Sequence, residues 1–466
     1  MRNQLRARQN ELSARRAILH SEFCILNSAL SLIPPAAAGI LVHEKRLGLT
    51  VGSFSGWDLK NLCILGSTGS IGVSTLKVVA QFPGKFRVRS MTAGRNVRQL
   101  AQQVRAFRPE RIAIADGRLV PELRALLEDG AGGLSARDAA RSTQQSALST
   151  QDCAPWRGEI LGGADSLVEL AEDPKSDYVV SAIVGAAGLL PTLAALKKGK
   201  IVGIANKEPL VMAGPLMLSA AKQSGATILP IDSEHSAVFQ SARAGGPREL
   251  RRVILTASGG PFRTASKEQL RQATKEDALK HPTWNMGAKI TIDSASLMNK
   301  ALEIIEAHFL FGVPYDAIEV WVHPQSIVHA LVEFSDSSVV AQLGLPDMRL
   351  PIQYALTYPE RLDGGLPELP LERMRNLVFE APDRERFPSL DFAYEAGRRG
   401  GTAPAVLNAA NEEAVALFLE DKIRFCGIFD LVGEALKAHP TRPVESLDSV
   451  LEADRWAREY VRGRCG

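Results

Sequence analysis

The chain has 466 residues, of which 45% are hydrophobic and 23% charged, as expected of a globular protein with two or three domains. The 55 lysines and arginines nearly balance the 52 aspartates and glutamates, which argues against a nucleic-acid or anionic-membrane partner. No apolar run reaches about eighteen residues, so no transmembrane helix is predicted. The five cysteines form no C-x-x-C pair, which argues against structural zinc and fits a reducing compartment.

Residues 1–58 have no clear fold pattern, and the first part of this segment is rich in arginine and poor in acidic residues. Such a composition is typical of a transit peptide. The alternative is a dispensable extension or a wrongly chosen start codon. In either case we expect the segment to lie outside the fold. We expect a cytoplasmic protein, or a protein of a plastid-type organelle if the segment is a transit peptide.

Residues 59–231 alternate between short apolar runs and helical patterns, which predicts a parallel α/β sheet. An insert near 130–155, rich in glycine, serine, alanine and glutamine, interrupts the alternation and predicts a flexible surface loop. The predicted strands are 61–65, 86–94, 111–116, 178–185, 201–206 and 226–232.

The pattern changes to α+β in residues 232–356. Residues 357–390 are rich in proline and charge and predict a linker, and residues 391–466 have helical patterns throughout. The strand candidates of the α+β region are 251–260, 317–334 and 338–345.

Gly66, Gly69 and Gly72 lie between the first strand and the first helix. Glycines at such a turn allow the backbone to approach a pyrophosphate at a helix N-terminus. The spacing is G-x-x-G-x-x-G rather than the commoner G-x-G-x-x-G, so a plain strand-to-helix turn is the alternative. After the second strand the chain offers Arg95 and Asn96 rather than a carboxylate, which favours NADP over NAD unless Arg95 is a solvated loop residue.

Asp232 and Glu234 flank Ser233 at the end of a predicted strand. Two carboxylates at this spacing can hold a hard divalent cation. Equally, Asp232 or Ser233 can cap the following helix. His235 alone is weak support for zinc.

Ser258 and the two glycines after it can present hydroxyl and backbone N–H groups to an oxyanion. His281, Trp284 and Met286 follow on a predicted loop, with Gly287 as a possible hinge. Such a loop can close over a ligand, although a loop that packs its own tryptophan is the alternative.

The segment 291–308 has the pattern of an amphipathic helix. Leu297, Ala301 and Ile304 share an apolar side, while Asn299, Glu303 and Glu306 share a polar side. A polar stripe usually faces water. The alternative is that it faces a ligand.

Several strings occur in one order along the chain: GSTGSIG, AIVGAAGLLPTLAAL, ANKEPLV, DSEHSAVFQ, TASGGPFR, HPTWNMGAKITIDSASLMNKALEIIEA, HPQSIVHALVEF, AQLGLPDMR and LNAANEEAV. Together they resemble the 1-deoxy-D-xylulose 5-phosphate reductoisomerase family. The resemblance runs from about residue 60 to the C-terminus and leaves out the insert.

The resemblance implies an α/β fold with a Rossmann-like NADPH-binding domain (59–231), an α+β catalytic domain with a mobile loop (232–356), a linker (357–390) and a C-terminal α-helical bundle (391–466). It also implies a homodimer, NADPH, and Mg²⁺ or Mn²⁺, with Co²⁺ as a third candidate. The implied reaction rearranges and reduces 1-deoxy-D-xylulose 5-phosphate, a small phosphorylated substrate, to 2-C-methyl-D-erythritol 4-phosphate in the non-mevalonate isoprenoid pathway. The metal is expected to act as a Lewis acid.

The same resemblance assigns residues to the expected site. The nucleotide contacts are Thr68, Gly69, Ser70, Ile71, Gly94, Arg95, Asn96, Asn206, Glu208 and Gly287. The metal ligands are Asp232, Glu234 and Glu303. The substrate contacts are Lys207, Ser233, Glu234, Ser258, His281, Ser294, Asn299, Lys300 and Glu303, with Glu234, Lys207, Lys300 and His281 as catalytic candidates.

Glu306 has no place in these assignments and is expected to be solvated or merely structural. Two other functions remain as alternatives. A different NADP-dependent dehydrogenase would share the glycine turn without needing three carboxylates together, and a non-catalytic nucleotide sensor would not keep the site carboxylates.

Overall fold

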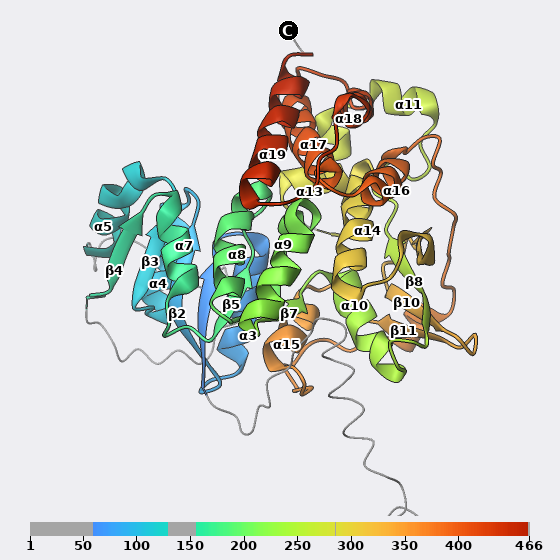
Figure 1. Cartoon of the computed structure of the whole chain (residues 1–466). Coiled ribbons are helices and arrows are strands. Elements are labelled where there is room, and N and C mark those ends of the chain that lie inside the picture. Colours follow the sequence, from blue (N-terminus) through green and yellow to red (C-terminus); the bar gives the residue numbers. More distant parts are fainter. Residues whose placement is uncertain (1–58, 129–154, 285, 465–466) are drawn as a thin grey trace, which may run out of the picture. The chain divides into compact units, whose positions relative to one another are not determined.

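The alternating region forms a seven-stranded sheet with strand order β4-β3-β2-β1-β5-β6-β7 and parallel pairing throughout (Figure 1). The computed structural model describes residues 59–128, 155–284 and 286–464, so the 1–58 segment and nearly all of the predicted insert lie outside the described residues. The strands are β1 (Lys60–Leu65), β2 (Phe86–Ala93), β3 (Arg111–Ile114), β4 (Glu159–Gly162), β5 (Tyr178–Ser181), β6 (Ile201–Ile204) and β7 (Thr227–Pro230).

The order of the strands places a crevice at the carboxyl ends of β1 and β5. The chain moves outward from β1 to β4, then returns to the other side of β1 and continues through β5, β6 and β7. Ligands of such sheets bind where the direction reverses. The helices between the strands are α3 (Ser70–Gln81), α4 (Val97–Phe107), α5 (Val120–Glu128), α7 (Ala164–Glu172), α8 (Leu189–Lys197) and α9 (Glu208–Ser224).

β4 was not among the predicted strands. It is an edge strand of four residues, and none of its side chains is fully buried. A strand of this kind lacks the continuous apolar run that identifies the inner strands, such as β5, whose four residues are all buried.

A second sheet of four strands has the order β11-β10-β8-β9. β10 is antiparallel to both β8 and β11, whereas β9 is parallel to β8. The single strand expected over 317–334 is therefore wrong, because Pro324 lacks an N–H group and Ser326 has a φ of +50°. The bounds are β8 (Leu250–Ala257), β9 (Ile318–Val322), β10 (Val328–Phe334) and β11 (Val339–Leu343).

The helix expected over 291–308 is two helices, α13 (Ala288–Ala295) and α14 (Met298–Phe311). Leu297 separates them in the left-handed conformation, with a φ of +57°. α14 packs between α9, α16 and β9. The other helices of this region are α10 (Ser233–Ser241), α11 (Lys267–Gln272), α12 (Lys275–Ala278) and α15 (Arg349–Thr357).

Four helices form the C-terminal region, which Figure 1 shows in orange and red. α17 contacts α16, α18 and α19, and it also packs against α9 and α13. Across the described ranges, no helix combines the length and apolar character needed to cross a membrane. The bounds are α16 (Ser389–Arg399), α17 (Ala403–Leu419), α18 (Gly427–Ala438) and α19 (Leu447–Arg462).

Candidate active site

A cavity of about 730 Å³ lies at the carboxyl ends of the parallel strands. Its walls come from the glycine turn after β1, the segments after β5, β6 and β7, the segment 281–290 and the start of α14. Fourteen predicted site residues line it: Gly69, Ser70, Ile71, Asn206, Glu208, Asp232, Ser233, Glu234, Ser258, His281, Gly287, Ser294, Asn299 and Lys300.

The glycine turn brings backbone N–H groups to one wall of this cavity. Gly66 has a φ of +85°, and a Cβ there would lie 2.6 Å from the carbonyl oxygen of Ala182. A Cβ on Gly72 would lie 2.4 Å from the carbonyl oxygen of Gly66, so glycine allows α3 to pack this closely on the turn. Gly69 is the N-cap and supplies no side-chain hydrogen bond to α3. The first N–H groups of α3 are thus available to a pyrophosphate.

The predicted contacts after β2 lie away from the cavity lining. Gly94, Arg95 and Asn96 are exposed at the carboxyl end of β2, and Asn96 caps α4 by accepting a hydrogen bond from the N–H of Gln99 at 3.1 Å. Thr68 is half-buried in the glycine turn and is likewise not part of the lining.

Arg95 faces a carboxylate that comes from the next strand. Its Nε lies 3.5 Å from Oδ2 of Asp116, which follows β3. Arg118 donates two hydrogen bonds of 2.8 Å to the same carboxylate. These bonds lower the pKa of Asp116 to about 2, so the group is an anion near neutral pH. Asp116 follows β3 rather than β2, so the sequence pattern at the end of β2 did not predict it.

Three predicted metal ligands and two lysines meet below the cavity. Lys207, just before α9, donates to Asp232 and, at 3.1 Å, to Glu303. Lys300 donates to Glu234 at 2.7 Å and to Glu303 on the same helix. Each ammonium therefore bridges a pair of carboxylates. Lys207 and Glu303 are buried beneath the lining rather than part of it.

The charges of this cluster shift its pKa values in different directions. Burial opposes the ammonium of Lys207, but the carboxylates of Asp232 and Glu303 outweigh it and raise its pKa well above the ordinary value. Burial also disfavours ionised Glu234, yet Lys300 lowers its pKa to about 2. Burial and the charge of Glu234 raise the pKa of Glu303 to about 7.

Asp232 both caps a helix and belongs to the cluster. Its Oδ1 accepts a hydrogen bond from the N–H of Ser233 at 3.0 Å, while its Oδ2 accepts from Lys207. Asp232 can therefore cap the helix and belong to the carboxylate cluster at the same time. Ser233 donates to Glu234 at 2.6 Å, which holds that carboxylate at the cavity wall.

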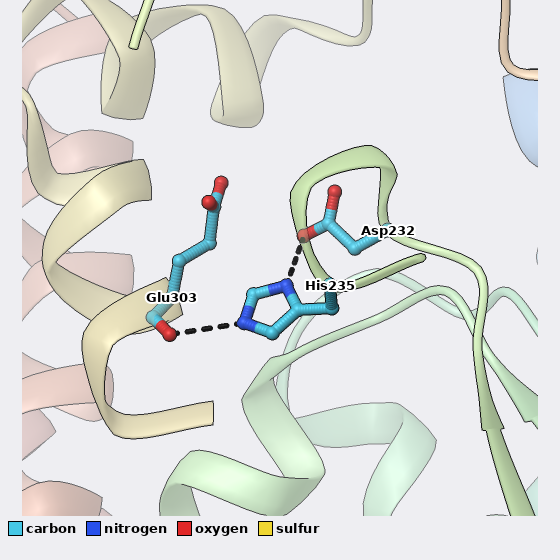
Figure 2. Close-up of side chains that lie close together, drawn as sticks. All are labelled: Asp232, His235 and Glu303. Carbon is cyan, nitrogen blue, oxygen red and sulfur yellow. Dashed lines mark hydrogen bonds and ion pairs between the residues drawn. The ribbon is translucent and has the colours of Figure 1, made fainter. Parts of the chain in front are cut away.

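The donor set fits a hard divalent cation. Figure 2 shows Asp232 and His235 opposite Glu303, and ligand atoms of these three residues lie within 4.8 Å of one another. The Nε2 of His235 contacts the backbone carbonyl of Glu303 at 3.0 Å, and this ring is fully buried and outside the lining. Glu234 is not a member of this close group, but it lines the cavity and shares Lys300 with Glu303. Three carboxylate groups with oxygen donors match the preference of Mg²⁺ or Mn²⁺ better than a buried imidazole does.

Ser258, His281 and Ser294, which were predicted as substrate contacts, form a second polar cluster on the cavity lining. The Nδ1 of His281 accepts hydrogen bonds from the N–H groups of Thr283, at 3.2 Å, and Trp284, at 2.9 Å. Its Nε2 therefore carries the proton of the neutral ring, and it lies 3.0 Å from Ser258 Oγ and 3.1 Å from Ser294 Oγ. Burial lowers the pKa of His281, which favours this neutral form. The cluster can donate to an oxyanion.

Two amides complete the predicted set. Asn299 donates to Glu303 at 2.6 Å and accepts from Lys207 at 2.9 Å. Asn206 accepts from Ser181 at 2.8 Å, and its Nδ2 is buried and has no hydrogen-bond partner within the ranges that the structure describes. An unpaired donor at the cavity is consistent with a ligand amide or phosphate as its partner.

The lining also includes residues that were not predicted, and Lys289 and His329 are two of them. Lys289 lies 2.8 Å from both Glu208 and Asp293, and His329 projects from β10 of the second sheet. Lys289 is part of the quoted string GAKITID, but a single lysine there has no spacing signal. Glu306 was expected to be solvated or merely structural; it is fully buried, so the first alternative is wrong and the second stays open.

Family models match most of the described chain. The model for 1-deoxy-D-xylulose 5-phosphate reductoisomerase matches residues 62–147 and 133–214. Two models for C-terminal domains of the same enzyme match residues 228–311 and 343–460.

Curated relatives and solved structures carry the same name. The reductoisomerase of Symbiobacterium thermophilum is 51% identical over 403 residues, which are 86% of this chain and 98% of the relative. A Synechococcus reductoisomerase is 50% identical over 400 residues, or 86% and 96% of the two chains. The Zymomonas mobilis enzyme in complex with NADPH has a TM-score of 0.77 and 42% identity, covering 88% of this chain and 99% of its own.

A structure of the enzyme with NADPH, fosmidomycin and magnesium has a TM-score of 0.79 and 39% identity, with 87% of this chain and 98% of that chain covered. These relatives and structures are each covered over nearly their whole length. The chain belongs to the 1-deoxy-D-xylulose 5-phosphate reductoisomerase family.

Proposed function

We propose that the cavity converts 1-deoxy-D-xylulose 5-phosphate to 2-C-methyl-D-erythritol 4-phosphate with NADPH and a divalent cation, a step of the non-mevalonate isoprenoid pathway. The chain is an NADPH-dependent oxidoreductase of this family. The observation that carries the residue assignment is that one cavity is lined by the glycine turn, by members of the carboxylate–lysine cluster and by the serine–histidine cluster.

The cofactor is assigned to the wall that the parallel sheet builds. The turn residues Thr68, Gly69, Ser70 and Ile71 would hold the pyrophosphate, because the N–H groups of α3 are free of a side-chain cap. Gly94, Arg95 and Asn96 would hold the adenosine end with its 2′-phosphate. Asn206, Glu208 and Gly287 lie on the lining and would meet the nicotinamide end.

The cation is assigned to Asp232, Glu234 and Glu303. When bound, the cation supplies Lewis-acid polarisation of the substrate carbonyl, and NADPH supplies the hydride. Lys207 and Lys300 stay charged beside these carboxylates, and they stabilise negative charge that develops on the substrate oxygens. A pKa of about 2 makes Glu234 a weak proton acceptor, so its assigned role is binding.

The phosphate of the substrate is assigned to the serine–histidine cluster. The hydroxyl oxygens of Ser258 and Ser294 each lie within 3.1 Å of the Nε2 of His281. Ser233, Asn299 and Lys300 line the same cavity and are assigned to the rest of the substrate. Binding energy from the phosphate then orients the reacting end of the substrate.

We extend the proposal to the organisation of the chain. The cofactor domain is residues 59–231, the catalytic domain 232–356, and the helical region 391–466 follows a linker of residues 357–390. We also propose a homodimer and a cytoplasmic location; the relatives named above are bacterial. Sedimentation of the purified protein tests the homodimer.

Loss of NADPH absorbance tests the reaction. The purified protein with 1-deoxy-D-xylulose 5-phosphate and Mn²⁺ is expected to oxidise NADPH, and a chelator is expected to stop it. No oxidation with Mg²⁺, Mn²⁺ or Co²⁺ would contradict the proposal. Oxidation that does not depend on a metal would favour a different NADP-dependent dehydrogenase.

A further inference from the structure

The motif LNAANEEAV, residues 407–415, lies on α17 outside the cavity lining. Its Asn411 is fully buried and donates to Oδ1 of Asp293 at 2.8 Å. Oδ2 of Asp293 lies 2.8 Å from the ammonium of Lys289, which in turn lies 2.8 Å from Glu208. Asn411 thus connects α17, through α13, with the first residue of α9.

The next residue of the motif contacts a different segment beside the cavity. Oε1 of Glu412 accepts a hydrogen bond of 3.0 Å from the N–H of Ala186, in the segment after β5, and Oε2 pairs with Arg458 at 2.6 Å. Gly185 has a φ of +77°, and a Cβ on it would lie 2.8 Å from Glu412. The backbone after β5 is therefore held against one carboxylate. Val184, just before it, lines the cavity.

The two contacts hold two walls of one cavity. The segment after β5 belongs to the cofactor side, and α13 carries Ser294 of the serine–histidine cluster. Neighbouring residues on a single turn of α17 contact both. The groups between them are largely buried, so a lost partner leaves an unpaired polar or charged group inside the protein. The distance between the walls is then sensitive to this turn of α17.

We propose that Asn411 and Glu412 are positioning residues that hold the cofactor-side and substrate-side walls at the spacing that NADPH and substrate require. The C-terminal helices are by this account part of the binding machinery, although they supply no residue to the lining among those described. The proposal rests on the assignment of the cavity to NADPH.

Glu412→Asp and Glu413→Asp form a matched pair for the test. Each removes one methylene group, keeps the charge and lies on the same helix. Glu413 accepts from Arg462 at 2.7 Å and lies 4.0 Å from Arg458, and within the described residues it has no hydrogen bond or ion pair to either wall. An aspartate at 412 is too short for the N–H of Ala186. The Kd for NADPH, from fluorescence titration, and the Tm are measured for both full-length variants.

We expect Glu412→Asp to raise the Kd for NADPH about tenfold and Glu413→Asp to leave the Kd within about twofold of the wild-type value. The Tm should change by a similar amount in the two variants. Asn411→Leu, which cannot donate to Asp293, is expected to raise the substrate KM about tenfold with a smaller change in kcat. An unchanged Kd in Glu412→Asp, or an equal rise in both aspartate variants, overturns the positioning role. A wild-type protein that does not bind NADPH overturns the cofactor assignment as well.

Discussion

The Nδ1 of His235 lies 3.3 Å from a carboxylate oxygen of Glu306, and both side chains are fully buried. The Nε2 of the same ring faces the carbonyl of Glu303 and must donate to it, so Nδ1 is left as an acceptor. Burial lowers the pKa of His235 to about 4 and raises that of Glu306 well above its usual range. Both shifts favour the uncharged forms, a neutral imidazole and a protonated acid that faces the ring nitrogen.

A neutral acid at 306 predicts that Glu306→Gln is tolerated. The amide keeps a donor for His235, so the free energy of unfolding should fall by less than about 1 kcal/mol. Glu306→Ala removes the donor and leaves a cavity, at a cost of about 2 to 4 kcal/mol. Urea denaturation at neutral pH measures both variants. Equal losses for Gln and Ala would indicate an ion pair instead.

Glu303→Gln separates metal binding from cofactor binding. The change keeps the shape of the side chain but removes the carboxylate that contacts both Lys207 and Lys300. Loss of a residue that only supports a metal ligand costs roughly 10- to 100-fold in activity. Loss of a ligand itself should lower kcat by more than that. The Kd for NADPH should change little. A parallel loss of turnover and NADPH binding would point to a folding role.

The affinity for Mn²⁺ should depend on pH through Glu303. Its pKa of about 7 lies above the ordinary value for a glutamate, so the metal-free protein holds a proton there at lower pH. A cation must expel that proton. The apparent affinity should thus fall as pH drops below about 7, by up to about tenfold per pH unit, and level off above it. Calorimetry in two buffers measures the affinity and the proton release. An affinity that is flat across this range, or unchanged release in Glu303→Gln, would contradict the prediction.

Ser258→Ala and Ser294→Ala test the phosphate assignment. Each removes one hydroxyl beside the Nε2 of His281. Because the phosphate does not react, its contacts exist before and during the reaction, and their loss should raise the substrate KM about tenfold with a smaller effect on kcat. Steady-state kinetics at saturating NADPH provides both constants. A rise in the NADPH Kd instead would assign the serines to the cofactor.

The features that sequence alone predicted are those with local signals. Gly66, Gly69 and Gly72 follow a buried strand, and Asp232 and Glu234 follow another, so strand ends and turn residues located both. The family resemblance supplied the rest of the residue set. The edge strand β4 has no such signal, because none of its four residues is fully buried.

Sequence patterns could not predict contacts between segments that are far apart in the chain. Lys207 meets Glu303 across 96 positions of the chain, and Asn411 meets Asp293 across 118. Helical spacing placed Glu306 on a polar side, but it could not tell that α14 packs against several elements or that Glu303 and Glu306 on this side are buried. Hydrophobic periodicity identifies one buried side of a helix, and it cannot exclude that the other is buried by neighbours.

Arg95→Asp tests the preference for NADPH. Arg95 has an exposed side chain 3.5 Å from Asp116, and Arg118 holds the same carboxylate through two hydrogen bonds. An aspartate at 95 places a second anion beside Asp116, where the 2′-phosphate is assigned, so repulsion should raise the NADPH KM about 10- to 100-fold and spare NADH. Arg98→Asp, an exposed position on α4, makes the same change in net charge and controls for the long-range field. The ratio of kcat/KM for the two nucleotides is the measurement. If both variants shift this ratio equally, the effect belongs to net charge, and if neither does, Arg95 does not contact the 2′-phosphate.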